Sequence, residues 1–206
     1  MNISKELNAE EYESIRNDHK YAIRAAEGPV LNIINDMENS SPWKVVHSHC
    51  SRIKELSSLN EKITRKIEKG YTPNKIKIDD IAGFRIVCVY KDDLERLSSL
   101  IDSAFPVIET CDYLNQPKEN GYRGIHKIIS IKITVNGCQK YTTAEIQIRS
   151  ATQDAFWSQE HARYKMQGDC DPKVMEEIRN IADNLDRNED WMIQVRDQLY
   201  KQKPAT

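Results

Sequence analysis

The stretch Tyr141-Thr-Thr-Ala-Glu-Ile-Gln-Ile-Arg149 alternates between two kinds of side chain. Successive side chains of a β-strand point to opposite faces of its sheet, so the alternation predicts a strand with two unlike faces. The small and apolar residues share one face: Thr142, Ala144, Ile146 and Ile148. The polar residues share the other: Tyr141, Thr143, Glu145, Gln147 and Arg149. Taken alone, the polar face is most simply a solvated surface, but a carboxylate, an amide and a guanidinium together also favour a ligand site.

Other segments predict further strands and helices around this strand. Asn136-Gly137 is a strong hairpin signal, and it joins expected strands at 125–135 and 141–148. Further strands are expected at 84–90 and 107–111, followed by a loop across 112–122, where Asn, Pro and Gly gather. Helical periodicity predicts helices at 58–69, 92–104 and 151–165.

The chain divides into three regions. A helix is expected from about Asn8 to Met37, where apolar residues recur at helical spacing, and Gly28-Pro29 predicts a kink or a break within it. The polar segment 38–42 then ends an N-terminal helical region, residues 1–42. Residues 43–168 form the predicted central domain, and residues 169–206 a C-terminal helical segment.

The C-terminal helix carries an apolar seam at alternating spacings of four and three residues. The seam consists of Val174, Ile178, Ile181, Leu185, Met192, Val195 and Leu199, with the polar Asn188 among them. Two arrangements explain it equally well. The helix packs on its own domain, or it forms a contact between subunits in which Asn188 sets the register.

Length and composition limit the types of protein to which this sequence can belong. The 206 residues suffice for one domain with its own core and appended helices. A net charge of -2 argues against binding nucleic acid by bulk positive charge, although basic residues cluster between Arg52 and Lys69. Five cysteines without a Cys-x-x-Cys pair indicate reduced thiols. The sequence has neither a leader pattern nor an apolar run of membrane length, so we expect a cytoplasmic protein with no membrane partner.

Three motifs precede the Glu145 strand in the chain. They are Arg52-Ile-Lys54, then the acidic Asp79-Asp80 running into an apolar strand that contains Arg85, then Asn120-Gly-Tyr-Arg-Gly-Ile-His126. In this order, the motifs resemble the synthetase domain of RelA/SpoT-type alarmone enzymes, which transfer pyrophosphate from ATP to the 3′-hydroxyl of GDP or GTP. The resemblance covers roughly residues 43–165 and rests on the ordered set, because no single motif is specific.

The resemblance implies an α+β fold, a nucleotidyltransferase-like mixed and largely antiparallel β-sheet flanked by helices. It also implies Mg²⁺ as the cofactor and a homo-oligomer, by resemblance a homotetramer. Asp80 matches the family's metal-binding aspartate, and Mg²⁺ is commonly held by one or two carboxylates together with substrate phosphates. Glu145 is implied to activate the 3′-hydroxyl as a general base while lying near or on Mg²⁺. The products would be (p)ppGpp, the signal of the stringent response, and AMP.

Basic residues match the positions that hold ATP in the family. Lysines serve as mobile charges on phosphates, and guanidinium planes stack on aromatic rings. The resemblance therefore assigns Arg52, Lys54 and Lys62 to ATP and implies that Arg52 and Arg85 sandwich adenine. Arg65, Lys66 and Lys69 are better explained as solvated charges of a helix.

The acceptor nucleotide is expected near Tyr122. The resemblance implies that this tyrosine stacks on guanine, and the preceding Gly121 lets the loop approach a ligand closely. The other residues expected around GDP or GTP are Lys118, Asn120, His126, Gln147 and Arg149. His161 is expected to support the same pocket from the following helix.

Departures from the family pattern leave the acceptor open. Arg123-Gly124 stands where many members have Gln-Ser, and Ser150 where threonine is frequent. One alternative is a toxic enzyme that pyrophosphorylates the 3′ end of tRNA or an adenine nucleotide, and RNA is also a candidate regulator. Another is a non-catalytic module that binds nucleotide or RNA, although such a module has no need of both Asp80 and Glu145. The chain lacks the His-Asp dipeptide of the family's manganese-dependent hydrolases, so we expect synthesis without degradation.

Overall fold

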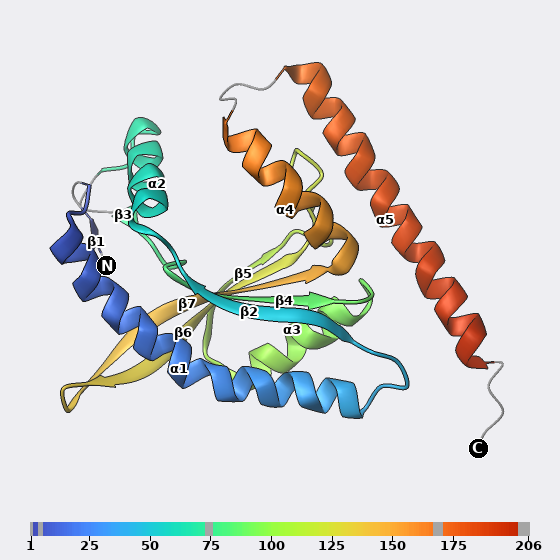
Figure 1. The fold of residues 1–206 in the computed structure, drawn as a ribbon, viewed down its shortest axis with the longest axis horizontal. Coiled ribbons are helices and arrows are strands. Elements are labelled where there is room, and N and C mark those ends of the chain that lie inside the picture. The colour runs from blue at the N-terminus through green and yellow to red at the C-terminus, as the bar shows by residue number, and fades with distance from the viewer. Residues whose placement is uncertain (1, 4–5, 73–75, 167–170, 202–206) are drawn as a thin grey trace.

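A five-stranded mixed β-sheet forms the centre of the molecule (Figure 1). The computed structural model describes residues 2–3, 6–72, 76–166 and 171–201, without the side chains of residues 2–3 and 159–166. In sheet order, the strands are β2 (Val46–Ile53), β4 (Ala82–Cys88), β7 (Cys138–Ser150), β6 (Ile125–Val135) and β5 (Val107–Asp112). Only the β4–β7 pair is parallel within this sheet, so the predicted α+β fold with a mixed, largely antiparallel sheet is confirmed.

Helices cover the two faces of the sheet unequally. In the view of Figure 1, α1 (Ala9–Asn39) and α3 (Asp93–Ala104) lie below the sheet, whereas α2 (Leu56–Glu68) and α4 (Ala151–Met166) rise above it. The last helix, α5 (Pro172–Lys201), runs beside α4. Two short strands, β1 (Asn2–Ile3) and β3 (Ile76–Lys77), pair antiparallel at the edge of the molecule near α2. Cavities lie on this upper face of the sheet, lined in part by residues of α2 and of α4.

Strand β7 shows the two faces that its sequence predicts. Ala144, Ile146 and Ile148 are fully buried in the main core, which also contains the buried face of α1. The β6–β7 hairpin closes through Asn136 and Gly137, whose φ angles are 50° and 77°. Positive φ at both positions is the requirement of a type I′ turn, so the predicted hairpin is confirmed. The polar face of β7 points toward the open side of the sheet.

The predicted break in the N-terminal helix is wrong, because α1 continues through Pro29. One of the clashes that a proline makes in a helix is with the Cβ of the residue before it, and Gly28 has none. Burial of Ala26 and Val30 on the main core offsets the lost backbone hydrogen bond. At the start of the helix, Asn8 forms a reciprocal capping box with Glu11.

The apolar seam of α5 is buried at one position and exposed at most of the others. Ile178 is buried beside Ala182 in a small cluster of this chain's own residues. Five other members are exposed: Val174, Ile181, Met192, Val195 and Leu199. The helix therefore packs on its own domain through one part of the seam and leaves the rest uncovered.

Two further findings concern membrane-spanning helices and the cysteines. Among the described helices, none combines the length with the apolar character needed to cross a bilayer. Cys50, Cys88, Cys111 and Cys138 are free thiols, as predicted, and Cys170 lies outside the described residues.

Candidate active site

Four adjacent strands bring polar side chains to the open face of the sheet. Arg85 of β4 and His126 of β6 are both paired with Gln147 of β7, one on each side. Residues paired across neighbouring strands point to the same face, so these three side chains form a row. Arg52 of β2 pairs with Gly83, which in turn pairs with Glu145. The row explains how residues far apart in the sequence meet at one site.

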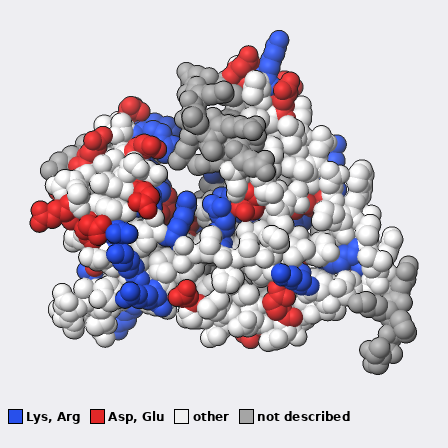
Figure 2. Space-filling model, in the orientation of Figure 1, with Lys and Arg blue, Asp and Glu red and all other residues white. Residues whose placement is uncertain are grey.

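Two adjoining cavities lie on this face. The larger has a volume of about 370 Å³ and contains eight of the predicted nucleotide-binding residues: Arg52, Arg85, Lys118, Asn120, Tyr122, His126, Gln147 and Arg149. The smaller, of about 220 Å³, contains three further predicted residues: Lys62, Asp80 and Glu145. His126 lines both cavities. Figure 2 shows Lys and Arg side chains beside the hollow at the middle of this face.

Asp80 is held by two lysines. Its Oδ2 atom accepts hydrogen bonds from the Nζ atoms of Lys54, at 2.5 Å, and of Lys62 on α2, at 2.7 Å. The backbone N–H of Lys54 donates to the carbonyl of Ile81, which fixes the end of β2 beside the aspartate. Burial opposes ionisation of Asp80, but the two ammonium groups outweigh it and lower its pKa to about 2. Burial lowers the pKa of Lys54 in spite of this partner.

The donor set in the smaller cavity fits Mg²⁺. The second oxygen of Asp80, Oδ1, is buried and has no hydrogen-bond partner. Asp80 and Glu145 line the same cavity, and the described residues contain no cluster of three or more His, Cys, Asp or Glu that would hold a metal alone. Mg²⁺ typically takes one or two carboxylates and completes its shell with water and substrate phosphates. An unpartnered carboxylate oxygen beside a second carboxylate meets that requirement.

Glu145 is fixed by two neighbours on the sheet. Nδ1 of His126 lies 3.0 Å from Oε1, and Nε2 of Gln147 donates to Oε2 at 2.6 Å. Burial opposes the charge, but the hydrogen bond and the charge of His126, followed by the hydrogen bond of Gln147, lower the pKa of Glu145. An ionised carboxylate in this cavity can accept a proton or bind a cation.

A chain of polar contacts continues from Glu145 into the larger cavity. Arg149 donates to Oε1 of Gln147 at 3.0 Å and to Oδ1 of Asp154 at 3.2 Å. Asp154 lies on α4 and also pairs with Arg85, at 3.3 Å. Helix α4 thus holds two guanidinium groups in place over the polar face of β7.

The ring of Tyr122 is buried and enclosed by other groups. Its hydroxyl lies 2.6 Å from Nε2 of His126, and its ring packs edge to face on Trp157. The charged ends of Lys118 and Arg149 lie 4.9 Å and 5.1 Å from the ring centroid. Two cations therefore lie close to the ring against which a nucleotide base would stack.

Sequence reasoning missed several residues of the site. Asp154, Trp157 and Ser158 contact the larger cavity or its arginines from α4, and Lys66 lines the smaller cavity beside Lys62. The spacing of the first three, at i, i+3 and i+4, marks one face of a helix and was the available signal. The side chain of His161 lies outside the described residues.

A family model, known relatives and solved structures all indicate the same family. Residues 51–169 match the family model described as a region found in RelA / SpoT proteins. The chain is 31% identical over 154 residues to GTP pyrophosphokinase YwaC of Bacillus subtilis, covering 70% of this chain and 73% of the relative. The crystal structure of small alarmone synthetase 2 from Bacillus subtilis has a TM-score of 0.78 at 26% identity and covers 91% of this chain and 98% of that one. Small alarmone synthetase 1 from the same organism, bound to its product pppGpp, has a TM-score of 0.80 at 24% identity over 93% and 98% of the two chains.

Proposed function

The chain belongs to the RelA/SpoT family, and from that premise we propose that it is a GTP/GDP pyrophosphokinase. The reaction moves the pyrophosphate of ATP to the 3′-hydroxyl of GDP or GTP, in the cytoplasm, and yields (p)ppGpp and AMP. The observation that carries the proposal is the pair of carboxylates, Asp80 and Glu145, in one cavity that adjoins a larger cavity lined by arginines and aromatic rings. Phosphoryl-type transfer needs this combination of positioned charge and oriented nucleophile.

ATP binding is proposed to rearrange the lysines around Asp80. Lys54 and Lys62 both pair with the carboxylate, and Lys62 lines the smaller cavity that the phosphates would enter. Arg52 and Arg85 line the larger cavity, where their guanidinium planes can stack on adenine. Asp80 and Glu145 would hold Mg²⁺, which would neutralise charge on the phosphates. The two lysines would then bind phosphate oxygens instead of Asp80.

Glu145 is proposed as the general base. It takes the proton of the 3′-hydroxyl while the O3′ atom forms a bond to the β-phosphorus of ATP. The bond between the β-phosphorus and the oxygen that bridges it to the α-phosphorus breaks, and AMP leaves. His126 and Gln147 orient the carboxylate so that one oxygen faces the acceptor.

The acceptor nucleotide is proposed to lie against Tyr122. The base displaces Lys118 from the tyrosine ring and leaves Arg149 in place, because Arg149 is tied to Asp154. Asn120 lines the same cavity. A guanine nucleotide then spans both cavities, with its ribose beside His126 and Glu145.

An acceptor of another kind is the second candidate. Arg123, the residue that departs from the family pattern, was the reason to consider tRNA or an adenine nucleotide. Its side chain bonds to α5 and does not line the larger cavity, so it offers no contact to a polyanion there. RNA as a regulator would have to bind the basic residues of α2 and of its C-cap, which are Lys62, Arg65, Lys66 and Lys69.

Position-specific labelling of ATP tests the reaction. Purified protein with Mg²⁺ and GDP should transfer label from the γ-phosphate of ATP to a product that contains guanosine, whereas label in the α-phosphate should appear in AMP. Transfer of the γ-phosphate alone would leave label from the α-phosphate in ADP, and that result would contradict pyrophosphate transfer.

A further inference from the structure

We propose that Arg123 is a positioning residue, which holds the loop of residues 120–124 in its acceptor-binding shape by anchoring it to α5. The loop, called here the acceptor loop, carries Asn120 and Tyr122 into the larger cavity. The inference rests on the proposed function, since it concerns how the same site receives GDP or GTP. It assigns a role to a residue that lines neither of the two cavities of the site.

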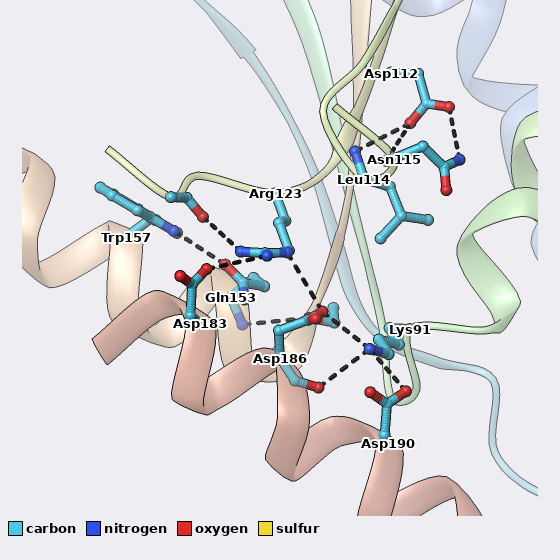
Figure 3. Close-up of polar contacts among 12 residues, drawn as sticks. Lys91, Asp112, Leu114, Asn115, Arg123, Gln153, Trp157, Asp183, Asp186 and Asp190 are labelled. Carbon is cyan, nitrogen blue, oxygen red and sulfur yellow. Dashed lines mark hydrogen bonds and ion pairs between the residues drawn. The ribbon is translucent and has the colours of Figure 1, made fainter. Parts of the chain in front are cut away.

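Arg123 binds two carboxylates of α5 (Figure 3). Its terminal NH2 group donates to Oδ1 of Asp183 at 3.1 Å, and its Nε lies 3.5 Å from Oδ1 of Asp186. Its NH1 group donates at 3.1 Å to the backbone carbonyl of Gly121, inside the acceptor loop. The side chain is only 14% exposed, so solvent screens these contacts less than those of a surface pair. One guanidinium therefore binds the loop backbone and the helix at the same time.

The backbone of the acceptor loop also packs directly on α5. Gly121 has a φ of 84°, and a Cβ atom added there would lie 2.8 Å from the Cβ of Ala182. Ala182 belongs to the buried cluster that contains Tyr122, Trp157 and Ile178. The position of the Tyr122 ring thus depends on contacts with α5 on the far side of the cavity.

Helix α5 is itself fixed to the central domain by the same acidic face. Asp183, Asp186 and Asp190 recur at i, i+3 and i+7 and therefore share one side of the helix. Nζ of Lys91, in the turn after β4, lies 2.9 Å from Oδ1 of Asp186 and 2.8 Å from Oδ1 of Asp190. Figure 3 shows Arg123 and Lys91 reaching this face from two different loops. Glu177 is an exposed carboxylate of the same helix and serves as the matched control, because removal of Asp190 would also weaken the contact of α5 with Lys91.

Loss of the contacts between Arg123 and α5 should weaken the binding of GDP or GTP and leave the binding of ATP unchanged. Without Arg123, the acceptor loop also adopts conformations in which Tyr122 and Asn120 no longer face the nucleotide. The apparent affinity for GDP then falls in proportion to the fraction of molecules whose loop has the binding conformation. Arg52, Lys54 and Lys62 belong to β2, its C-terminal end and α2, not to the acceptor loop, so we expect ATP binding to stay intact. For a partly buried pair, we expect the KM for GDP to rise about tenfold in Arg123→Ala.

The experiment is a double-mutant cycle with Arg123→Ala, Asp183→Asn and their combination, beside the control Glu177→Gln. The KM values for GDP and for ATP, the kcat, and the dissociation constant of GDP by calorimetry are measured for each. Each single variant should raise the KM and the dissociation constant for GDP, the combination should add little to Arg123→Ala, and the KM for ATP should stay within about twofold. Glu177→Gln should behave as wild type.

Two results would contradict the proposed role of Arg123. In the first, Asp183→Asn matches wild type while Arg123→Ala is impaired, which would mean that Arg123 acts without α5. In the second, all variants match wild type, or the KM for ATP rises as much as that for GDP. Both results require that wild-type protein binds GDP and forms product. Wild-type protein that does neither would contradict the proposed function, and this inference with it.

Discussion

Nδ1 of His126 lies 3.0 Å from Oε1 of Glu145, and this contact joins the two cavities of the site. The other nitrogen of the same ring lies 2.6 Å from the hydroxyl of Tyr122. His126 thereby connects the residue proposed to accept the base with the residue proposed to accept the proton. Each of the predictions about catalysis follows from this chain of contacts or from the lysines around Asp80.

Glu145→Gln should remove the base and keep its shape. A glutamine cannot accept the proton of the 3′-hydroxyl, so we expect kcat to fall by at least about a hundredfold. Turnover is measured by conversion of GDP with saturating ATP and Mg²⁺, and thermal unfolding checks that the variant folds. The control is Glu68→Gln, an exposed carboxylate of α2, which should keep wild-type activity. A folded Glu145→Gln variant with more than roughly a tenth of wild-type turnover would refute the assigned role.

His126→Ala should move the acid limb of the pH–rate profile. His126 helps to lower the pKa of Glu145, so its loss raises that pKa, and the carboxylate becomes protonated at a higher pH. Activity that needs ionised Glu145 should then fall off at a higher pH than in wild type. The profile of kcat against pH measures the shift, with the exposed His47→Ala as control. An acid limb that stays in place would show that His126 does not tune Glu145.

The ion pairs of Asp80 should stabilise the fold in a defined pH window. The pKa of Asp80 falls from 3.8 to about 2, so the contribution, about 2 kcal/mol, is complete above the ordinary value and is lost as the pH falls through about 2. Lys62→Met removes one ammonium group and should raise the pKa of Asp80. Carboxyl NMR titration detects this, with Lys69→Met, on the exposed end of α2, as control. A titration of Asp80 near 3.8 in wild type would contradict the paired geometry.

The exposed part of the α5 seam should form a contact between subunits. Met192, Val195 and Leu199 are 45%, 55% and 59% exposed, and with Trp191 they border an open groove. Met192→Glu with Val195→Glu should place charges in that contact and dissociate an oligomer. The control is Gln194→Glu, which adds a charge to an exposed polar position of the same turn. Light scattering that finds wild-type monomers at micromolar concentration would rule out the contact.

Much of the fold was predictable because its signals are local. The alternation in β7, the Asn136-Gly137 turn and the periodicity of the helices each fix an element within a few residues of its observed bounds. Strand β2 was missed because it is an edge strand whose residues are nearly all exposed, so no alternation reveals it. The break at Pro29 was wrong because tertiary packing overrides a local penalty.

Only those residues of the site that belong to sequence motifs could be predicted. Asp80, Glu145 and the residues around them follow from the family resemblance, and the structure brings them to two adjoining cavities. The partners of Arg123 could not be foreseen, because Asp183 lies 60 residues further along the chain and no pattern links the two. The cations that cover Tyr122 depend on the same long-range packing.

Competition between acceptors tests the central claim most directly. Purified protein receives ATP labelled at the γ-phosphate and Mg²⁺ with equal concentrations of GDP, GTP and deacylated tRNA in one tube, and the label in each product is measured over time. We predict that the label accumulates in guanosine nucleotides that carry a new 3′-pyrophosphate and that tRNA stays unlabelled. Efficient transfer to the 3′ end of tRNA, with GDP and GTP unmodified, would contradict the assignment of a free guanine nucleotide as the acceptor.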